Sequence, residues 1–189
     1  MCSRPLTRIP PYTHTHTHTH LVYVHPHRAG TETLSVKSVS VNGEVVPVAL
    51  AGDNVDVVVG GVDESALRPG QVLTWPSHPI PAITRFKAQI ATLPGMEFPM
   101  VAGQQFVLHT HVLEEPAVVT RLLRTLSSDG HTDLIKPRCL TSGQTAVVRI
   151  RVPRHVALEM YADQKRLGRF MLRYSGTTVA AGMVLKLTM

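Results

Sequence analysis

The sequence has 189 residues, 43% of them hydrophobic, so it is long enough to bury a core and is not disordered throughout. Its apolar residues occur in short stretches between 13 Gly and 14 Pro, and no run reaches the length of about 18 residues that a membrane-spanning helix needs. The N-terminus has no apolar core of a secretory signal, and Cys2 and Cys139 are too few for a disulfide framework or a zinc site. We therefore expect a soluble, cytoplasmic protein without a membrane partner.

The net charge of +6 is unevenly distributed along the chain. Residues 82–189 contain 14 Lys and Arg against 7 Asp and Glu, whereas residues 1–81 contain 5 against 6. A basic segment suggests a polyanionic neighbour such as RNA, or an acidic protein face. The alternative is that the charge only keeps the protein soluble.

Residues 1–29 are expected to form a disordered tail, because Thr and His alternate from Thr13 to His20 and no core could form there. Imidazole is a common metal ligand, but a flexible repeat has no fixed geometry, so a His-rich metal binder is the weaker hypothesis. The codons for alternating Thr and His can be written as an uninterrupted alternation of the nucleotides A and C, so the segment is also what a translated dinucleotide repeat would look like. We take the tail as a misread intron or an alternative first exon.

Residues 30–76 are predicted to form a first β region. Apolar and polar residues alternate with period two over residues 34–41, and Asn42-Gly43 then predicts a tight hairpin turn. Further strands are expected at residues 45–48 and 55–59, and Arg68-Pro69-Gly70 predicts another turn.

Residues 77–83 are predicted to be a stiff linker, because residues 74–82 contain three prolines, which neither a helix nor a central strand accepts. A second β region is expected over residues 84–189. The alternation there places Phe86, Ala88 and Ile90 on an inward face.

The same alternation recurs in the rest of the second β region, with apolar side chains inward and arginines outward. Residues 146–152 and 169–173 follow it, and Phe170 and Leu172 are predicted to face the interior. Several short strands separated by Gly and Pro turns predict a small closed barrel. We expect its interior to be packed with side chains and too small for a ligand.

Several segments resemble the translational GTPases of the elongation factor Tu type. The string LGRFMLRYSGTTVAAG at residues 167–182 is similar to the closing hairpin of that family's last barrel, as are residues 136–140 and 84–90. Residues 51–55 and 67–73 are similar to the end of its middle barrel. The resemblance implies an all-β fold of two small barrels of the domain II and domain III type. The first barrel would be incomplete, since its opening strands would precede residue 30.

Within that superfamily, the sequence FMLRY at residues 170–174 is similar to the HBS-like ribosome-rescue factors. Release-factor GTPases and elongation factor 1-alpha usually carry an acidic residue where Tyr174 stands. The step Arg138-Cys139-Leu140-Thr141 also favours the HBS-like branch, and the release factors remain the alternative. The resemblance implies a role in ribosome rescue, with the ribosome and the tRNA-shaped protein Pelota as partners.

The chain contains no Gly-Lys pair, no Asp followed three residues later by Gly, and no Asn-Lys pair. GTP binding in this family depends on such motifs for its phosphate, magnesium and guanine contacts. We therefore predict that the chain is not an enzyme and takes no cofactor. The alternative is a fragment of an active GTPase whose true start lies upstream.

The candidate partner-binding surface consists of the outward and loop arginines of the second β region and one aromatic residue. Arginine suits bidentate recognition of phosphates and carboxylates, although any single one is most often only solvated. The candidate residues are Arg121, Arg124, Arg138, Arg149, Arg151, Arg169, Arg173 and Tyr174.

Other combinations of reactive residues are expected to be structural. His109 and His111 would share one face of a strand, but no third metal ligand lies nearby. Glu114 and Glu115 are expected to be turn charges, because adjacent residues of an extended chain point in opposite directions. Residues 127–131, which contain Ser, Asp and His, are predicted to be a solvated hairpin loop, and Cys139 a free thiol.

Overall fold

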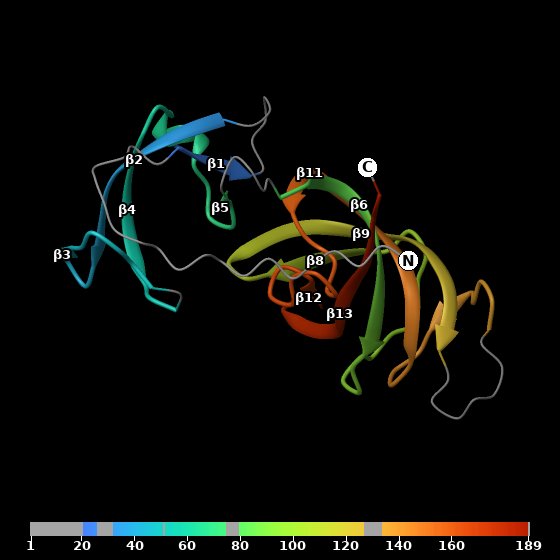
Figure 1. The fold of residues 1–189 in the computed structure, drawn as a ribbon. Coiled ribbons are helices and arrows are strands. Elements are labelled where there is room, and N and C mark those ends of the chain that lie inside the picture. The colour runs from blue at the N-terminus through green and yellow to red at the C-terminus, as the bar shows by residue number, and fades with distance from the viewer. Residues whose placement is uncertain (1–20, 26–31, 51, 75–79, 127–133, 189) are drawn as a thin grey trace.

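A computed structural model describes residues 21–25, 32–50, 52–74, 80–126 and 134–188, which form two β regions (Figure 1). Within these ranges the only helical element is the 3-10 turn η1, Glu64–Ala66. The predicted all-β fold is therefore confirmed. None of the described residues belongs to a helix that is long and apolar enough to cross a membrane.

The first region is an open sheet of five strands in which β3, β2, β1 and β5 lie side by side and β4 pairs with β2. Asn42 and Gly43 have φ angles of 53° and 86°, as the predicted hairpin turn requires. The strands are β1, Leu21–His25; β2, Glu32–Val41; β3, Glu44–Val45; β4, Val55–Gly60; and β5, Val72–Thr74.

Strand β1 corrects the predicted end of the tail at residue 29. Val22 lies opposite Leu34 of β2, and Val24 lies opposite Leu73 of β5, so β1 is the central link between these two strands. Without β1, the facing edges of β2 and β5 would have unpaired backbone N–H and C=O groups. The backbone of β1, a short segment rich in residues that favour strands, pairs with these groups. The Thr-His alternation and Cys2 lie outside the described residues.

The second region is a closed barrel of six antiparallel strands in the order β11, β6, β13, β12, β8 and β9. The small strands β7, Met100–Val101, and β10, Cys139–Leu140, form a separate pair. Ala82 already belongs to β6, so this strand begins inside the predicted linker. The barrel strands are β6, Ala82–Thr92; β8, Gln105–Thr110; β9, Leu113–Leu126; β11, Thr145–Ala157; β12, Arg169–Tyr174; and β13, Thr177–Thr188.

The barrel interior holds the apolar residues that the alternation predicted. Phe86, Ala88 and Ile90 are fully buried, and the ring of Phe86 meets the edge of Phe170 at a centroid distance of 5.5 Å. Gly182 on the neighbouring strand makes room for Phe170, since a Cβ at this position would collide with that ring. The core is therefore filled by interlocking side chains.

The turn between β8 and β9 is tighter than the sequence suggested. His111 has a φ of 53° and lies in the turn, so it does not share a strand face with His109. Glu114 and Glu115 lie in β9, opposite β8, and are not turn charges. The prediction was wrong because a two-residue turn leaves β9 to begin already at Leu113.

Candidate binding surfaces of the barrel

The strand register brings four cationic side chains into one row on the outside of the barrel. Arg149 of β11 lies opposite Arg121 of β9 on one side and Lys87 of β6 on the other. Lys87 in turn lies opposite Lys186 of β13. Four neighbouring strands thus each contribute one cation, over a width of roughly 14 Å at the usual strand spacing.

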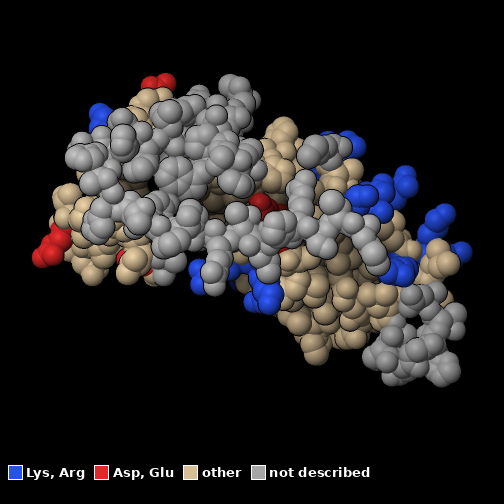
Figure 2. Space-filling model, viewed as in Figure 1, with Lys and Arg blue, Asp and Glu red and all other residues tan. Residues whose placement is uncertain are grey.

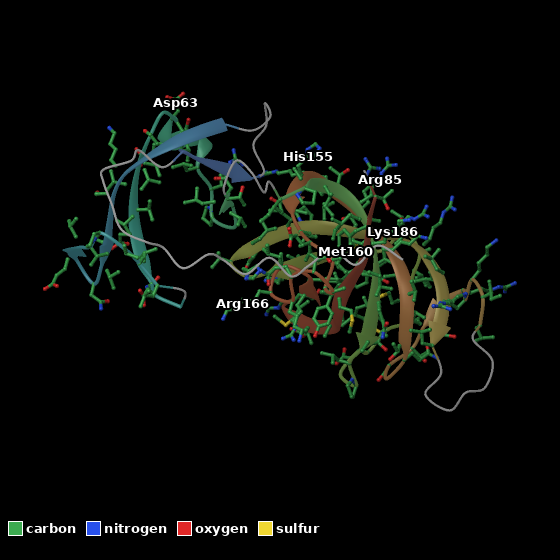
Figure 3. All side chains as sticks on the ribbon, in the orientation of Figure 1. Asp63, Arg85, His155, Met160, Arg166 and Lys186 are labelled. Carbon is green, nitrogen blue, oxygen red and sulfur yellow. The ribbon has the colours of Figure 1, made fainter. Side chains whose placement is uncertain are left out.

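A second pair of cations flanks this row. Arg151 of β11 lies opposite Arg85 of β6, two residues away from the first row on each strand. We call the six residues together the basic ladder: Arg85, Lys87, Arg121, Arg149, Arg151 and Lys186. Figure 3 places Arg85 and Lys186 close together at the upper side of the barrel, and Figure 2 shows Lys and Arg side chains gathered along this end of the molecule.

No acidic side chain of the described residues forms an ion pair with the basic ladder. The barrel's ion pairs between described residues join His109 Nδ1 to Glu114 Oε1 at 3.3 Å and Arg154 Nη1 to Glu115 Oε1 at 3.6 Å. Arg149 is half-buried, and its Nε has no acceptor. Among the residues that the structure describes, the positive charge of the basic ladder therefore has no acidic ion-pair partner.

Strand β12 carries a different surface, which we call the β12 surface: Arg169, Met171, Arg173 and Tyr174. In the closed ring of six strands, β12 stands three positions from β11 in either direction, so the β12 surface faces away from the centre of the basic ladder. Met171 and Tyr174 are 48% and 40% exposed.

The arginines of the β12 surface are held by neighbouring groups. Arg169 Nη2 donates a hydrogen bond to Tyr161 Oη at 3.1 Å, and its guanidinium lies 5.3 Å from the centre of that ring. This hydrogen bond and the nearby positive charge lower the pKa of Tyr161. Arg173 Nη2 donates to the backbone oxygen of Gly176 in the following turn. Both side chains are therefore oriented before any partner binds.

Tyr174 anchors a small aromatic cluster at the end of β12. Its ring lies 4.6 Å from Phe98 and 6.0 Å from Phe106, measured between ring centroids. The cluster fixes one face of Tyr174 and leaves the other part of the side chain accessible. A tyrosine that is held on one side by aromatic rings and is still 40% exposed is typical of the residues that contribute most to protein interfaces.

The eight predicted residues are thus not one surface. Arg121, Arg149 and Arg151 belong to the basic ladder, and Arg169, Arg173 and Tyr174 to the β12 surface. Arg124 forms an isolated bridge with Ile135 beyond the main strand pairing, and Arg138 is exposed just before β10.

Sequence reasoning missed three members of the basic ladder: Arg85, Lys87 and Lys186. The alternation in β6 already indicated that Arg85 and Lys87 point outward. Their grouping with Arg149 depends on which strands are neighbours and in which register, and alternation within one strand does not contain that information.

The described residues hold no group of three or more His, Cys, Asp or Glu that could bind a metal ion. Cys139 is an exposed free cysteine, as predicted. Residues 127–131 lie outside the described residues. Burial raises the pKa of Glu159, and the nearby carboxylate of Asp163 raises it further.

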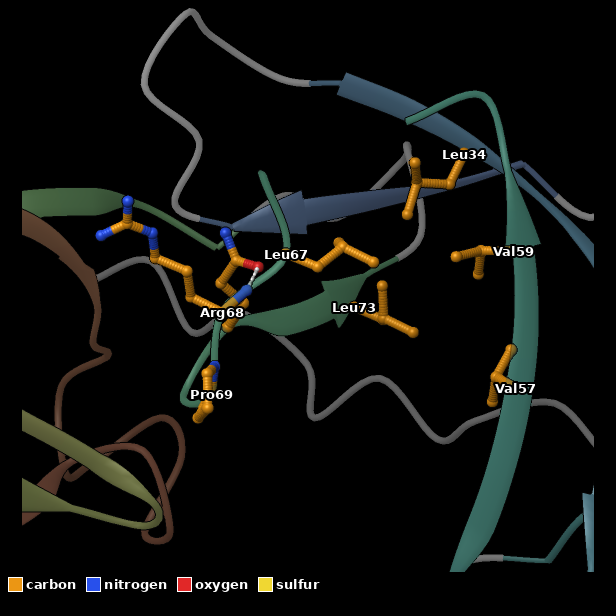
Figure 4. A pocket seen from close by; sticks show the side chains of 8 residues that line it. Leu34, Val57, Val59, Leu67, Arg68, Pro69 and Leu73 are labelled. Atoms are coloured by element: carbon orange, nitrogen blue, oxygen red, sulfur yellow. Dashed lines mark hydrogen bonds between the residues drawn. The ribbon is translucent and has the colours of Figure 1, made fainter. Parts of the chain in front are cut away.

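The first sheet has a cavity of about 390 Å³ on its concave side (Figure 4). Its wall is mostly aliphatic, and the backbone N–H of Arg68 donates to Gln71 Oε1 at 2.7 Å within it. Leu67 and Leu73 remain 38% and 45% exposed there. The cavity thus lies against the apolar inner face of the first sheet, which does not close into a barrel. The lining residues are Leu34, Val57, Val59, Leu67, Arg68, Pro69, Gln71 and Leu73.

Comparison with known proteins shows similarity to translation factors. The chain is 39% identical over 160 residues to Protein HBS1 of Drosophila melanogaster, covering 84% of this chain and 24% of that protein. It is 35% identical over 170 residues to the eukaryotic peptide chain release factor GTP-binding subunit of Kluyveromyces lactis, covering 85% of this chain and 24% of that protein. The chain thus spans about a quarter of the length of these relatives.

The fold is similar to that of Sup35 solved in complex with GMPPNP, with a TM-score of 0.81 and 32% sequence identity over 90% of this chain and 41% of that chain. The family model described as GTP-eEF1A C-terminal domain-like matches residues 85–185, which are nearly the whole barrel. The resemblance stated from the sequence is thereby confirmed. The chain belongs to the GTP-eEF1A C-terminal domain-like family.

Proposed function

We propose that the chain is a non-catalytic binding part of a cytoplasmic translation factor that acts in ribosome rescue. Its barrel would dock a Pelota-type, tRNA-shaped protein at the ribosome. The similarity to Protein HBS1 extends over 84% of the chain and supports the rescue branch. Tyr174, which stands where release-factor GTPases usually carry an acidic residue, supports the same branch.

The observation that carries the docking role is the composition of the β12 surface. It combines two oriented arginines with exposed Met171 and a tyrosine that is braced by Phe98. Arginine, tyrosine and methionine are enriched in protein interfaces, because each presents a large contact area with a polar or polarisable group. Arginines that are already held in place lose little side-chain entropy when a partner binds.

The test is a binding titration of the full chain with a purified Pelota-type protein. Met171→Asp places a charge in the centre of the β12 surface without touching the barrel interior, and we expect affinity to fall at least about tenfold, or about 1.4 kcal/mol. Leu185→Asp, at an apolar residue of β13 that is 42% exposed, is the matched control and should change affinity less than about twofold. Equal losses in both variants, or no binding by the unaltered chain, would contradict the docking role.

A second function is supported by the 35% identity to the release-factor subunit and the similarity to Sup35. The chain would then be part of a GTP-binding peptide-chain release factor or an elongation factor 1-alpha type protein whose full-length form is a GTPase. The same titration with the other subunit of the release factor distinguishes the two. Tighter binding to that subunit than to the Pelota-type protein would favour the release factor.

A further inference from the structure

The described residues leave the aliphatic inner face of the first sheet largely uncovered. Val57 and Val59 of β4 are directed toward Leu73 across the cavity (Figure 4). Paired residues of neighbouring strands point to the same face, so the partners of these valines in β2 line the inner face as well. Every inner residue of β2 and β4 is aliphatic, and one of them, Leu34, is fully buried. The inner residues are Leu34, Val36, Val39, Val41, Val55, Val57 and Val59.

Strand β4 also has an unpaired edge. It pairs with β2 on one side, and no described strand pairs with it on the other. Its six residues form an edge of about 20 Å at about 3.3 Å per residue. The other outer strands of the sheet, β3 and β5, have only two and three residues. An unpaired edge as long as that of β4 is a template for a further strand.

The sequence of β4 has few of the features that keep an edge strand single. The segment VDVVVG contains neither Pro nor Lys, and Asp56 is its one charged residue. The extra residue in the β2–β4 pair is Lys37, which lies in β2 and leaves β4 regular. On the outer face of β4, Val58 is 52% exposed. The edge is therefore regular, mostly apolar and open to pairing.

The order of residues in β4 favours a second copy of the chain as the partner strand. In an antiparallel pair centred on Val57, the inner valines of one copy face those of the other, and Asp56 faces Val58 of the second copy. Centring the pair on Asp56 would place two carboxylates directly opposite each other, which destabilises a sheet. A shift that breaks the alternation would place the inner face of one copy beside the outer face of the other. The register centred on Val57 avoids both.

We propose that β4 is a self-association edge, through which two copies of the chain pair antiparallel about a two-fold axis at Val57. Such a symmetric contact uses the same surface on both copies, so it ends at the dimer. It joins the two first sheets into one and makes their aliphatic inner faces continuous. A single pair of strands is a small interface, so we expect a dissociation constant of about 1–100 µM. The proposal does not rest on the docking role, because β4 belongs to the first sheet.

The test is sedimentation velocity of the full chain between about 1 and 300 µM, a range that covers the expected dissociation constant. We expect the mass to rise with concentration from the 20.7 kDa of one chain toward twice that value. Hydrogen exchange is then compared at the two ends of this range. The amides of β4 should exchange more slowly at the higher concentration, because pairing protects them.

The proposed register predicts opposite effects for two charges at the same position. Val58→Asp puts a carboxylate opposite Asp56 of the second copy, twice in the symmetric dimer, and should weaken dimerisation at least about tenfold. Val58→Lys puts an ammonium group there instead, so dimerisation should be as strong as in the unaltered chain or stronger. The double variant Asp56→Lys/Val58→Asp again places opposite charges face to face. It should recover the dimer that Val58→Asp loses.

The matched control is Val45→Asp, the same substitution at a residue of β3 in the same sheet that is 76% exposed. It should change the dissociation constant less than about twofold. Val45 and Val58 are both exposed in the single chain, so circular dichroism should show the same fold in every variant. If Val58→Asp did not fold, Val58→Lys and the hydrogen exchange of the unaltered chain would still test the edge.

The proposal is overturned if the chain stays monomeric at about 300 µM, or if Val58→Lys or Val45→Asp weakens the dimer as much as Val58→Asp does. Growth beyond the dimer would also overturn it, since a symmetric contact ends at two copies. Val58→Asp should still bind the Pelota-type protein as the unaltered chain does. A monomeric variant that keeps this binding would separate self-association from the docking role.

Discussion

The barrel and the first sheet have similar proportions of apolar residues but very different cores. The barrel closes, so the inward residues of its six strands join in one core cluster, and residues such as Phe86 and Leu172 are fully buried. The first sheet is open, and Leu34 is the one aliphatic side chain that it buries fully among the described residues. Closure, rather than composition, therefore decides how much apolar surface the fold removes from water.

The two regions also touch. Gly70, in a turn of the first sheet with a φ of 87°, lies so close to Leu113 at the start of β9 that a Cβ at Gly70 would come within 2.7 Å of the Leu113 Cβ. A larger side chain could not fit at that turn. The contact indicates that the turn of the first sheet is adapted to the β8–β9 end of the barrel.

The largest effect is expected when a core side chain is truncated and the free energy of unfolding is compared between the two regions. Phe86→Ala should lower the free energy of unfolding by about 3–5 kcal/mol, because it removes a buried ring that also supports Phe170. Leu73→Ala in the first sheet should cost less than about 1 kcal/mol, since the side chain is 45% exposed. Urea unfolding followed by far-UV circular dichroism measures both. A Leu73→Ala effect as large as that of Phe86→Ala would show that the first sheet is equally well packed.

A smaller effect is expected when a methyl group is added to a glycine in each region. Gly182→Ala would push against the Phe170 ring in a filled core and should cost about 1–3 kcal/mol. Gly60→Ala in the first sheet comes closest to the end of the flexible Lys37 side chain, which can move aside, and meets Ser35 Oγ at an ordinary contact distance of 3.4 Å. Its melting temperature should stay close to that of the unaltered chain, and a drop as large as that of Gly182→Ala would be inconsistent with an open sheet.

The smallest effect concerns one buried threonine in each region. Thr92 Oγ1 donates to the Thr141 carbonyl at 2.6 Å and accepts from the Gln144 N–H at 2.8 Å, so Thr92→Val should cost about 1 kcal/mol. Thr74 Oγ1 in β5 is buried without a hydrogen bond, so Thr74→Val should leave stability unchanged or raise it. Thermal unfolding of both variants is the measurement. If only Thr74→Val lowered the melting temperature, the Thr74 hydroxyl rather than the Thr92 hydroxyl would be the one that stabilises the fold by hydrogen bonding.

The amino-acid sequence was enough to predict the all-β class, most of the strands, and which residues of β6, β11 and β12 face the core. It could do so because alternation with period two is a property of a single strand, and Phe86, Ala88 and Ile90 show it directly. The Asn42-Gly43 turn was also predictable, since those residue types tolerate positive φ. The family resemblance could be read from contiguous strings, because it is carried by residues that are neighbours in the chain.

The folded structure was needed to show which strands that are distant in the sequence lie side by side. Residues 21–25 belong to the first sheet because their backbone groups pair with those of β2 and β5. A run of five residues is too short for its sequence to predict this strand. The folded structure also placed six of the eight candidate residues on two separate surfaces, left Arg124 and Arg138 outside both, and added Arg85, Lys87 and Lys186 to the basic ladder. Register between strands depends on hydrogen bonds between residues that are distant in sequence. Lys87 and Lys186 lie almost a hundred positions apart, and only the closed barrel brings them face to face.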